Sequence, residues 1–404
     1  MVAILSDPTP AAVNAPLAPR EAATAPGIYL HIPFCHRKCD YCAFVSLPCR
    51  RPPVSYLQAL RRQARQLAEL PWSRRQTFGT IFIGGGTPTS YPAAQLAALL
   101  AELRSLFCCR GAAGDEPEIT VECNPGTITL EGLRQLRAAG VNRLSIGIQS
   151  FADHLLTAVG RGHDRAAALA ALKLVRQVGF EDYNLDLMYG LPGQSIADFK
   201  ADLLTALEAE PTHLALYQLT PEAGTPLAVR LEAGQQTLPS DEACATMEAQ
   251  ARELLTEMVY EQYEVANYSL PGYQCRHNLN YWHNGSYLGL GAAAFSSLAG
   301  LRLGNVNGPG HYRRRLAAGR APYATAEALG REAAFRETVI MGLRLSRGVE
   351  IAELQRRFAL TPADYYGTML NNLLAAGLLV ADNGRLALSR RAFPLANQVL
   401  SQLV

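Results

Sequence analysis

The first half of the chain alternates between short apolar stretches and longer amphipathic ones. Apolar runs of strand length lie at 27–34, 80–85, 118–122, 143–150, 183–189 and 213–220. Between them, apolar residues recur at three- and four-residue spacing, which is typical of helices, at 54–70, 93–107, 130–139, 164–178 and 195–209. Six strand-and-helix units in this order predict an α/β fold with a parallel sheet and helices outside it. The count favours a partial (β/α)6 barrel over a closed barrel of eight strands.

The pattern changes after about residue 320. We expect helices at 326–345, 351–358, 362–375 and 391–403, and a hairpin at 378–388 around the turn signature Asp382-Asn383-Gly384. Helices followed by a hairpin resemble a winged helix, a fold that can bind nucleic acid. Segment 362–375 contains neither Lys nor Arg, so we expect little affinity for phosphates and no nucleic-acid partner.

These patterns divide the chain into four parts. We predict a disordered leader at 1–26, a barrel core at 27–225, a barrel-edge and ligand segment at 226–320, and a smaller C-terminal helical, winged-helix-like domain at 321–404. The leader is rich in Ala and Pro and lacks the basic start and apolar core of a signal peptide.

Composition narrows the class of protein further. The formal net charge is +2, from 37 basic and 35 acidic residues, so no polyanion-binding surface is implied. The nine cysteines follow no regular framework, which indicates a reducing compartment where thiols serve as ligands or core residues. Because no apolar run is long enough to span a bilayer, we expect a cytoplasmic protein without a membrane span.

The first predicted strand runs directly into three cysteines spaced C-x3-C-x2-C: Cys35, Cys39 and Cys42. This spacing lets three thiolates in one loop reach a single small group. A structural zinc site needs four ligands, so a zinc loop would have to borrow another, such as His36 or Cys49. A four-iron cluster held by three cysteines keeps one iron open for a further ligand. We favour the cluster, and zinc is the alternative.

The motif Tyr29-Leu-His-Ile-Pro-Phe-Cys35, with Tyr41 between the later cysteines, resembles the radical S-adenosylmethionine (SAM) superfamily. More narrowly, it resembles the oxygen-independent coproporphyrinogen III oxidases and the HemW-type heme chaperones, over nearly the whole chain from about residue 27. The resemblance implies a radical-SAM barrel, and a [4Fe–4S] cluster on the three cysteines whose open iron binds the amino and carboxylate groups of SAM. Tyr29 and Tyr41 are then expected at the cofactor.

Further motifs follow the later predicted strands, at the edge of a parallel sheet where ligands usually bind. The glycines at 84–86 allow positive φ and close approach to a ligand, although a tight turn would also use them. The resemblance assigns Gly85, Gly86 and Thr87 to the amino end of SAM.

Four more polar residues are assigned to SAM by the resemblance: Glu122, Gln149, Arg161 and Asp186. Without the resemblance, Glu122 would be interpreted as a surface residue or a helix cap. Asp186 lies inside an apolar strand, where a carboxylate needs a partner, and that partner can be structural.

One position separates the two branches of the resemblance. The oxidases carry a further cysteine two residues after the third, where this chain has Phe44. The pattern therefore resembles the HemW branch, which implies heme as cargo and hemoproteins as acceptors, with transient membrane-associated partners among them. The alternative is an oxidase that decarboxylates coproporphyrinogen III to protoporphyrinogen IX with a SAM-derived radical.

The segment His277-Asn-Leu-Asn-Tyr281-Trp282 resembles the H-N-x-x-Y-W motif of the HemW branch, which implies a role in holding heme. An imidazole can ligate iron and the two aromatic rings offer flat apolar faces, while Cys275 is a second possible ligand. A structural role for His277 at the barrel edge is the alternative. Phe295 stands where relatives usually carry a histidine.

Overall fold

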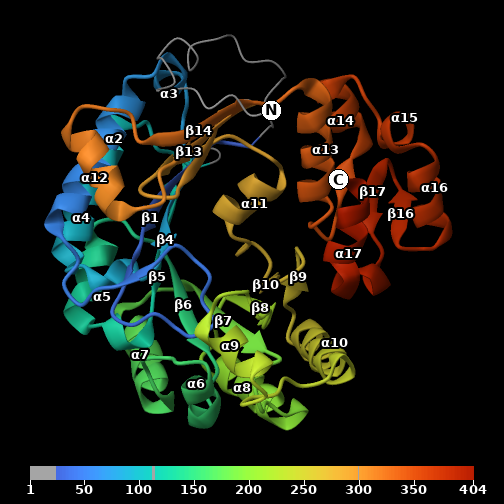
Figure 1. The fold of residues 1–404 in the computed structure, drawn as a ribbon, viewed down its shortest axis with the longest axis horizontal. Helices are drawn as coiled ribbons and strands as arrows, with labels where there is room; N and C mark the ends of the chain where they lie inside the picture. Colours follow the sequence, from blue (N-terminus) through green and yellow to red (C-terminus); the bar gives the residue numbers. More distant parts are fainter. Residues whose placement is uncertain (1–23, 112–113, 299) are drawn as a thin grey trace.

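The computed structural model describes residues 24–111, 114–298 and 300–404, so all but the last three residues of the predicted leader lie outside it. Seven parallel strands form the centre of one large sheet, and Figure 1 shows how the sheet curves through the molecule. In spatial order they are β11 (Tyr287–Leu290), β1 (Gly27–Ile32), β4 (Thr80–Gly85), β5 (Glu118–Cys123), β6 (Arg143–Gln149), β7 (Asp182–Tyr189) and β8 (His213–Gln218).

Antiparallel strands extend this sheet at both edges. Beyond β8 lie β10 (Asn267–Ser269) and β9 (Glu261–Gln262), and beyond β11 lie β12 (Phe295–Leu298), β13 (Leu301–Asn305) and β14 (Tyr323–Ala328). Within the described residues the end strands β14 and β9 do not pair, so the sheet stays open. The predicted α/β partial barrel is therefore confirmed, with β11 as an additional parallel strand.

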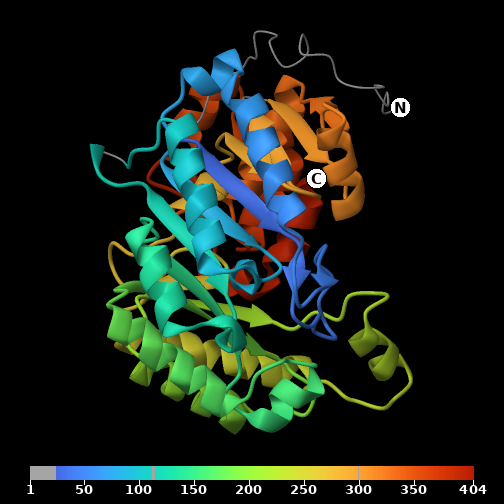
Figure 2. The ribbon, with the colours of Figure 1, turned by 90° about the vertical axis from the view of Figure 1, so that its left-hand side faces the viewer.

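Helices cover the outer face of the sheet, as Figure 2 shows from the helical side. The crossover helices are α2 (Val54–Ala68), α4 (Ala93–Leu106), α5 (Leu130–Ala138), α7 (Arg165–Val178) and α8 (Ile196–Glu208). Because side chains alternate along a strand, Ile28, Leu30 and Ile32 of β1 point into the fully buried core under these helices. Tyr29 and His31 consequently face the concave side.

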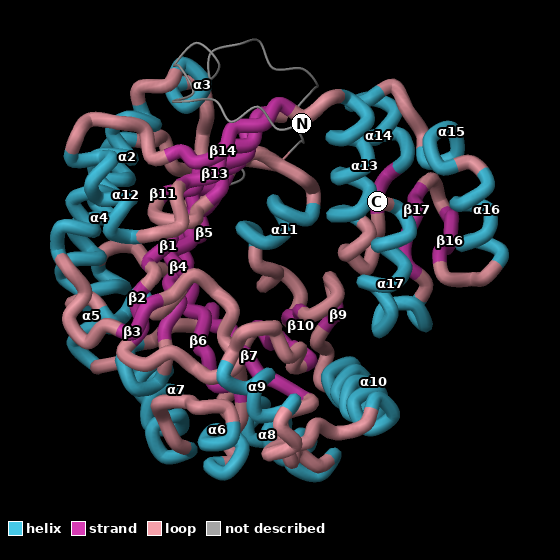
Figure 3. The backbone as a smooth tube through the Cα atoms, in the orientation of Figure 1, coloured by secondary structure: helices cyan, strands magenta, loops and turns pink. Residues whose placement is uncertain are grey.

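Further helices complete this part of the molecule: α3 (Pro71–Arg74), α6 (Asp153–Ala158), α9 (Pro226–Glu232), α10 (Asp241–Glu257), α11 (Arg276–Trp282) and α12 (Pro309–Ala317). In the tube view of Figure 3, α11 lies on the concave side of the sheet, opposite the crossover helices. None of the helices in the described part of the chain is both long and apolar enough to cross a membrane.

A second hydrophobic core lies in the C-terminal part, around Phe335, Phe358 and Leu386. Its elements are α13 (Arg331–Gly342), β15 (Val349–Glu350), α14 (Ile351–Phe358), α15 (Pro362–Tyr366), α16 (Thr368–Ala375), β16 (Leu379–Asp382), β17 (Arg385–Leu388) and α17 (Ala396–Leu400). The predicted hairpin is β16 and β17, and β15 adds a third strand to it. The expected helical, winged-helix-like arrangement is thus present.

Three helix predictions in this part were wrong in detail. Residues 323–328 form β14 in the large sheet, because they pair with β13, and the helix begins only at Arg331. The helix expected at 362–375 is broken at Gly367, whose φ of 51° suits a left-handed residue and not a helix. The last segment is two 3-10 turns around the short α17, and Pro394 interrupts it.

Candidate functional site

The cysteine loop is anchored on both sides. It begins in β2 (Phe34–Cys35), which pairs with β3 (Leu47–Pro48) in a small two-stranded sheet. In its middle, the backbone of Asp40 donates to Val159 O at 3.1 Å and accepts from Leu227 N at 2.9 Å. The Asp40 carboxylate also pairs with Arg230 at 2.9 Å. Tyr41 packs against a small buried apolar cluster that includes Leu155 and Leu227, so the loop is anchored by the protein itself.

All three predicted cluster cysteines are half-buried free thiols in this loop. Burial raises the pKa of the Cys35 thiol, the charges of Cys39 and Cys42 raise it further, and hydrogen bonds from Thr87 and Ser46 oppose these effects. Within the described ranges no three His, Cys, Asp or Glu side chains are placed to hold one metal ion. Cysteines of a four-iron cluster bind different irons, so they need not meet at one ion.

Arg161 connects the cysteine loop to the ends of β5 and β6. Its Nη1 lies 3.3 Å from Cys39 Sγ, its Nη2 lies 2.7 Å from Asn124 Oδ1, and Nη2 also donates to the carbonyl of Gly147. The nearby Tyr41 and Cys39 raise the pKa of Arg161 against the effect of burial. Its buried Nε has no hydrogen-bond partner among the described residues. Arg161 therefore ties the cysteine loop to the ends of these two strands.

The glycine-rich turn after β4 packs tightly against β1. Gly85 has a φ of +110°, and a Cβ there would lie 2.4 Å from His31 Nδ1. A Cβ on Gly86 would lie 2.8 Å from the carbonyl oxygen of Phe34. Thr87 Oγ1 accepts a hydrogen bond from Asn124 Nδ2 at 2.6 Å. Only glycine fits at these two positions, which places the turn directly beside the cysteine loop.

Two carboxyl groups face the concave side near this turn. Burial raises the pKa of Glu122 to about 7 although Gly85 N donates to its Oε2 at 2.9 Å, and the charge of Asp186 adds to the shift. Burial also raises the pKa of Asp186 to about 6, and Asn184 Nδ2 donates to it at 2.6 Å. Neither carboxylate forms an ion pair with a described residue, so the pair is suited to a cationic ligand.

Gln149 and Tyr29 complete the group of residues predicted to contact the cofactor. Gln149 has a φ of 69° at an irregularity between β6 and β7, and its amide lies beside Gly147. The Tyr29 hydroxyl is 2.9 Å from His31 Nδ1, and His31 Nε2 is 2.9 Å from the carbonyl oxygen of Val45 in the cysteine loop. Burial raises the pKa of Tyr29, and the nearby charge of Glu122 raises it further. The predicted SAM residues therefore lie together around the carboxyl ends of the strands.

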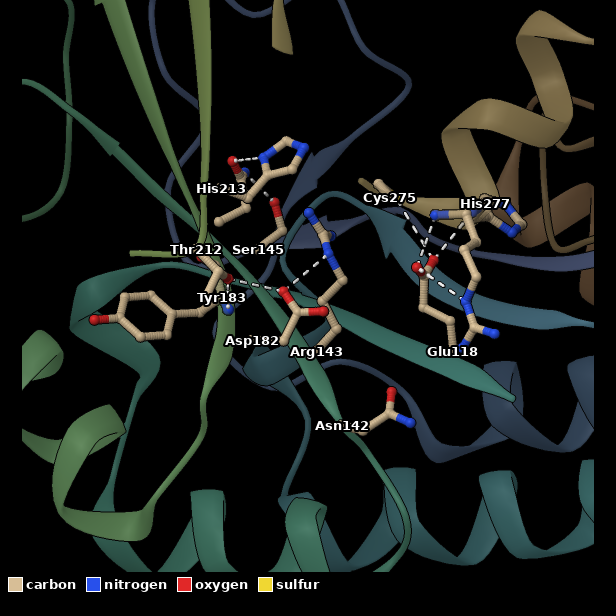
Figure 4. A network of polar contacts seen from close by, with 12 residues as sticks. Glu118, Asn142, Arg143, Ser145, Asp182, Tyr183, Thr212, His213, Cys275 and His277 are labelled. Carbon is tan, nitrogen blue, oxygen red and sulfur yellow. Dashed lines mark hydrogen bonds and ion pairs between the residues drawn. The ribbon is translucent and has the colours of Figure 1, made fainter. Parts of the chain in front are cut away.

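His277 lies at the opposite end of the strands, on the floor of the barrel that Figure 4 shows. Its Nδ1 is 2.6 Å from Thr80 Oγ1, its Nε2 is 3.0 Å from the Tyr281 hydroxyl, and its ring stacks on Phe82. Burial lowers its pKa to about 3. Both ring nitrogens are therefore engaged, and ligation of a heme iron would require one of these bonds to break.

Glu118 holds helix α11 against this floor. Its carboxylate accepts hydrogen bonds from the backbone N–H groups of Arg276 at 2.7 Å and His277 at 3.0 Å (Figure 4). Next to it, Arg143 is buried with its Nε 3.6 Å from Asp182 Oδ1. This layer was not predicted from the sequence, although Glu118 and Arg143 open predicted strands and Asp182 directly precedes one, which was a usable signal.

Comparison with known proteins identifies the family. A model described as the Radical SAM superfamily matches residues 29–206, and one described as the HemN C-terminal domain matches residues 329–395. The heme chaperone HemW of Lactococcus lactis is 33% identical over 377 residues, which cover 93% of this chain and 96% of that protein. This chain belongs to the HemW family of radical SAM proteins.

Other similarities agree with membership of the HemW family. The heme chaperone HemW of Escherichia coli is 41% identical over 269 residues, covering 66% of this chain and 68% of that protein. The solved structure of the Escherichia coli coproporphyrinogen III oxidase HemN, a radical SAM enzyme, superposes with a TM-score of 0.80 at 25% identity. That match covers 94% of this chain and 90% of HemN. Membership of the superfamily implies a [4Fe–4S] cluster and SAM.

The residues at the strand ends fit these two groups. The loop supplies three free thiols, one of which already receives a guanidinium donor. Glu122 and Asp186 form no ion pair with a described residue, and the Arg161 guanidinium lies at the same strand ends, where its charge acts on Asp186. An amino acid head carries one cation and one anion, and the site offers a complement to each.

Proposed function

We propose that this HemW-family protein binds heme and delivers it to hemoproteins. The observation that carries the proposal is the end-to-end similarity to the Lactococcus lactis heme chaperone, which spans both the barrel and the C-terminal part. Acceptors would include membrane-associated hemoproteins of respiration. All nine cysteines are free thiols, which supports action in the reducing cytoplasm.

In this proposal, Cys35, Cys39 and Cys42 hold the cluster, and SAM lies across the strand ends. When bound, the two supply a reducible cluster and a sulfonium that an electron can cleave. The protein's own part is to orient SAM: Gly85, Gly86 and Thr87 border its amino end, Glu122 and Asp186 balance its positive charge, and Arg161 pairs with its carboxylate. Tyr29, Tyr41 and Gln149 close the walls of the site.

Decarboxylation of coproporphyrinogen III is the second candidate, favoured by the overall similarity to HemN. Against it stands Phe44, at the position where the oxidases are expected to carry a further cysteine. Phe44 has no thiol to offer at the cluster. Its side chain is 71% exposed, so it does not fill the core either. For this reason we place heme transfer first.

The two candidates separate in one pair of assays on anaerobically reconstituted protein. The first follows protoporphyrinogen IX formation from coproporphyrinogen III with SAM and reductant, against a Cys39→Ser control. The second titrates ferric heme into the same preparation and follows its absorbance. We expect heme binding and no product. Product above the control would make the protein an oxidase, and absence of heme binding would end the chaperone proposal.

A further inference from the structure

The outer surface of the cysteine loop carries apolar side chains that nothing in the described chain covers. Phe44 is 71% exposed, Leu47 is 47% exposed and Val45 is 38% exposed. They follow directly after Cys42, on the solvent side of the loop, while Ser46 between them is buried and faces Cys42. Three adjacent exposed apolar residues beside a predicted redox centre indicate a surface that binds an apolar partner.

His36 and Arg50 follow the two strands of the small β2–β3 sheet, which contains Leu47. Phe34 pairs with Leu47, and Cys49 N donates to Cys35 O at 2.7 Å. His36 therefore lies about one strand spacing, ~4.8 Å, from the backbone of Cys49, and Arg50 follows at once. On the other side, Lys38 Nζ donates to the carbonyl oxygen of Phe44 at 3.2 Å.

The charged side chains of this loop are mostly basic. Segment 36–54 contains Arg37, Lys38, Arg50 and Arg51, and its one acidic residue, Asp40, is neutralised by Arg230 at 2.9 Å. Arg50 and Arg51 are exposed, and neither forms an ion pair with a described residue. An apolar face bordered by two free guanidinium groups is complementary to an apolar molecule that carries carboxylates.

His36 supplies an imidazole that is free to bind iron. Its side chain is exposed and makes no hydrogen bond to a described residue. In contrast, both ring nitrogens of His31 and of His277 are bonded, to Tyr29 and Val45 in the first case and to Thr80 and Tyr281 in the second. An imidazole is a common ligand of heme iron.

We infer that heme binds on this cysteine-loop face, made of His36, Phe44, Val45, Leu47, Arg50 and Arg51. The macrocycle lies on the three apolar side chains, His36 ligates the iron, and the two arginines pair with the propionates. The inference rests on the proposed heme function and adds its location. An anionic membrane would also complement an apolar and basic surface, but a membrane does not ligate a free imidazole, so heme is the better match.

The test titrates ferric heme into the full-length, anaerobically reconstituted protein and its variants. Phe44→Ser removes the most exposed ring, and covering about half of a phenylalanine predicts about fivefold weaker binding. His36→Ala is expected to remove the absorption spectrum of histidine-ligated heme. Arg50→Gln with Arg51→Gln is expected to weaken binding about fivefold.

Matched controls change the same residue types elsewhere on the surface. Val259→Ser removes an apolar side chain that is 65% exposed, His311→Ala removes an exposed imidazole, and Arg134→Gln removes an exposed guanidinium. None of the three is expected to alter heme affinity or spectrum. Cluster absorbance and SAM binding are recorded for every variant, to show that the loop itself is intact.

The outcomes separate the location from the function. Weaker binding in the loop variants, with intact cluster and unchanged controls, supports the inference. Heme binding that survives all loop variants overturns the location and leaves the proposed function standing. A loss of heme ligation confined to a His277→Ala variant that retains cluster absorbance and SAM binding, or adhesion of the loop face to anionic vesicles without a heme effect, likewise overturns it. No heme binding by the unaltered protein overturns both.

Discussion

Helix α11 is fastened to the sheet by the His277 ring, so His277→Ala should destabilise the protein. The ring bonds the hydroxyls of Thr80 and Tyr281 and stacks on Phe82 with centroids 5.1 Å apart. Its removal leaves a cavity and deprives two hydroxyls of a partner. Because a buried cavity and an unsatisfied polar group each cost a few kcal/mol, we expect the free energy of unfolding to fall by about 3–5 kcal/mol.

The same ring makes stability depend on pH. Burial holds the pKa of His277 at about 3, against 6.5 for a free imidazole. Between these values the unfolded chain binds a proton that the folded protein does not, so acid favours unfolding. The stabilisation is complete above pH 6.5 and is lost as the pH falls toward 3. At about pH 5 the loss amounts to 1.5 pH units, or about 2 kcal/mol.

Urea unfolding at about pH 7.5 and about pH 5 measures both effects. Fluorescence of Trp282, on α11 itself, reports the relevant region, and His277→Gln serves as a variant that cannot titrate. The stability gap between the unaltered protein and His277→Gln should narrow by about 2 kcal/mol at the lower pH. His154→Ala, an exposed histidine, is the control. An unchanged gap, or a His277→Ala variant as stable as the parent, would refute the assigned anchoring role.

Three further predictions concern the site at the strand ends. Cys39→Ser should abolish cluster absorbance and SAM binding, and a normal cluster in that variant would remove Cys39 from the ligands. Gly85→Ala should lower the stability and the SAM affinity far more than Gly193→Ala. Both glycines have positive φ, but only at Gly85 would the added carbon lie 2.4 Å from the His31 ring. Equal effects of the two substitutions would contradict the packing. Glu122→Gln should weaken SAM binding about tenfold and abolish the rise in SAM affinity as the pH increases through about 7. The same pH profile in the variant and the unaltered protein would exclude the Glu122 carboxylate as a SAM contact.

The six strand-and-helix units could be predicted because each is signalled within its own segment. The apolar runs at β1 and β4 are bounded by glycines and prolines, and the crossover helices carry a clear three- and four-residue repeat. The right-handed crossover then fixes the order of the strands without knowledge of distant contacts. The cysteine loop was recognisable for the same reason, since its three thiols lie within eight positions.

The strands beyond β1, from β11 to β14, depend on pairing between distant segments and could not be predicted in this way. Strand β11 has only four residues and is ordered by pairing with β1, some 260 positions earlier. Strand β14 contains Ala and Glu, which favour helices, yet its pairing with β13 overrides that preference. The bonds of His277 to Thr80 and of Arg161 to Asn124 likewise join residues from different units.

Transfer of heme to an acceptor tests the central claim most directly. The reconstituted protein is loaded with ferric heme, mixed with a resin-bound apo-hemoprotein, and separated from it, and heme on the acceptor is measured by absorbance over time. Free ferric heme and heme-loaded albumin provide the comparisons. The proposed function predicts transfer that is faster than from albumin and that requires contact with the acceptor. Retention of heme by the protein, or a rate equal to that of albumin, would contradict it.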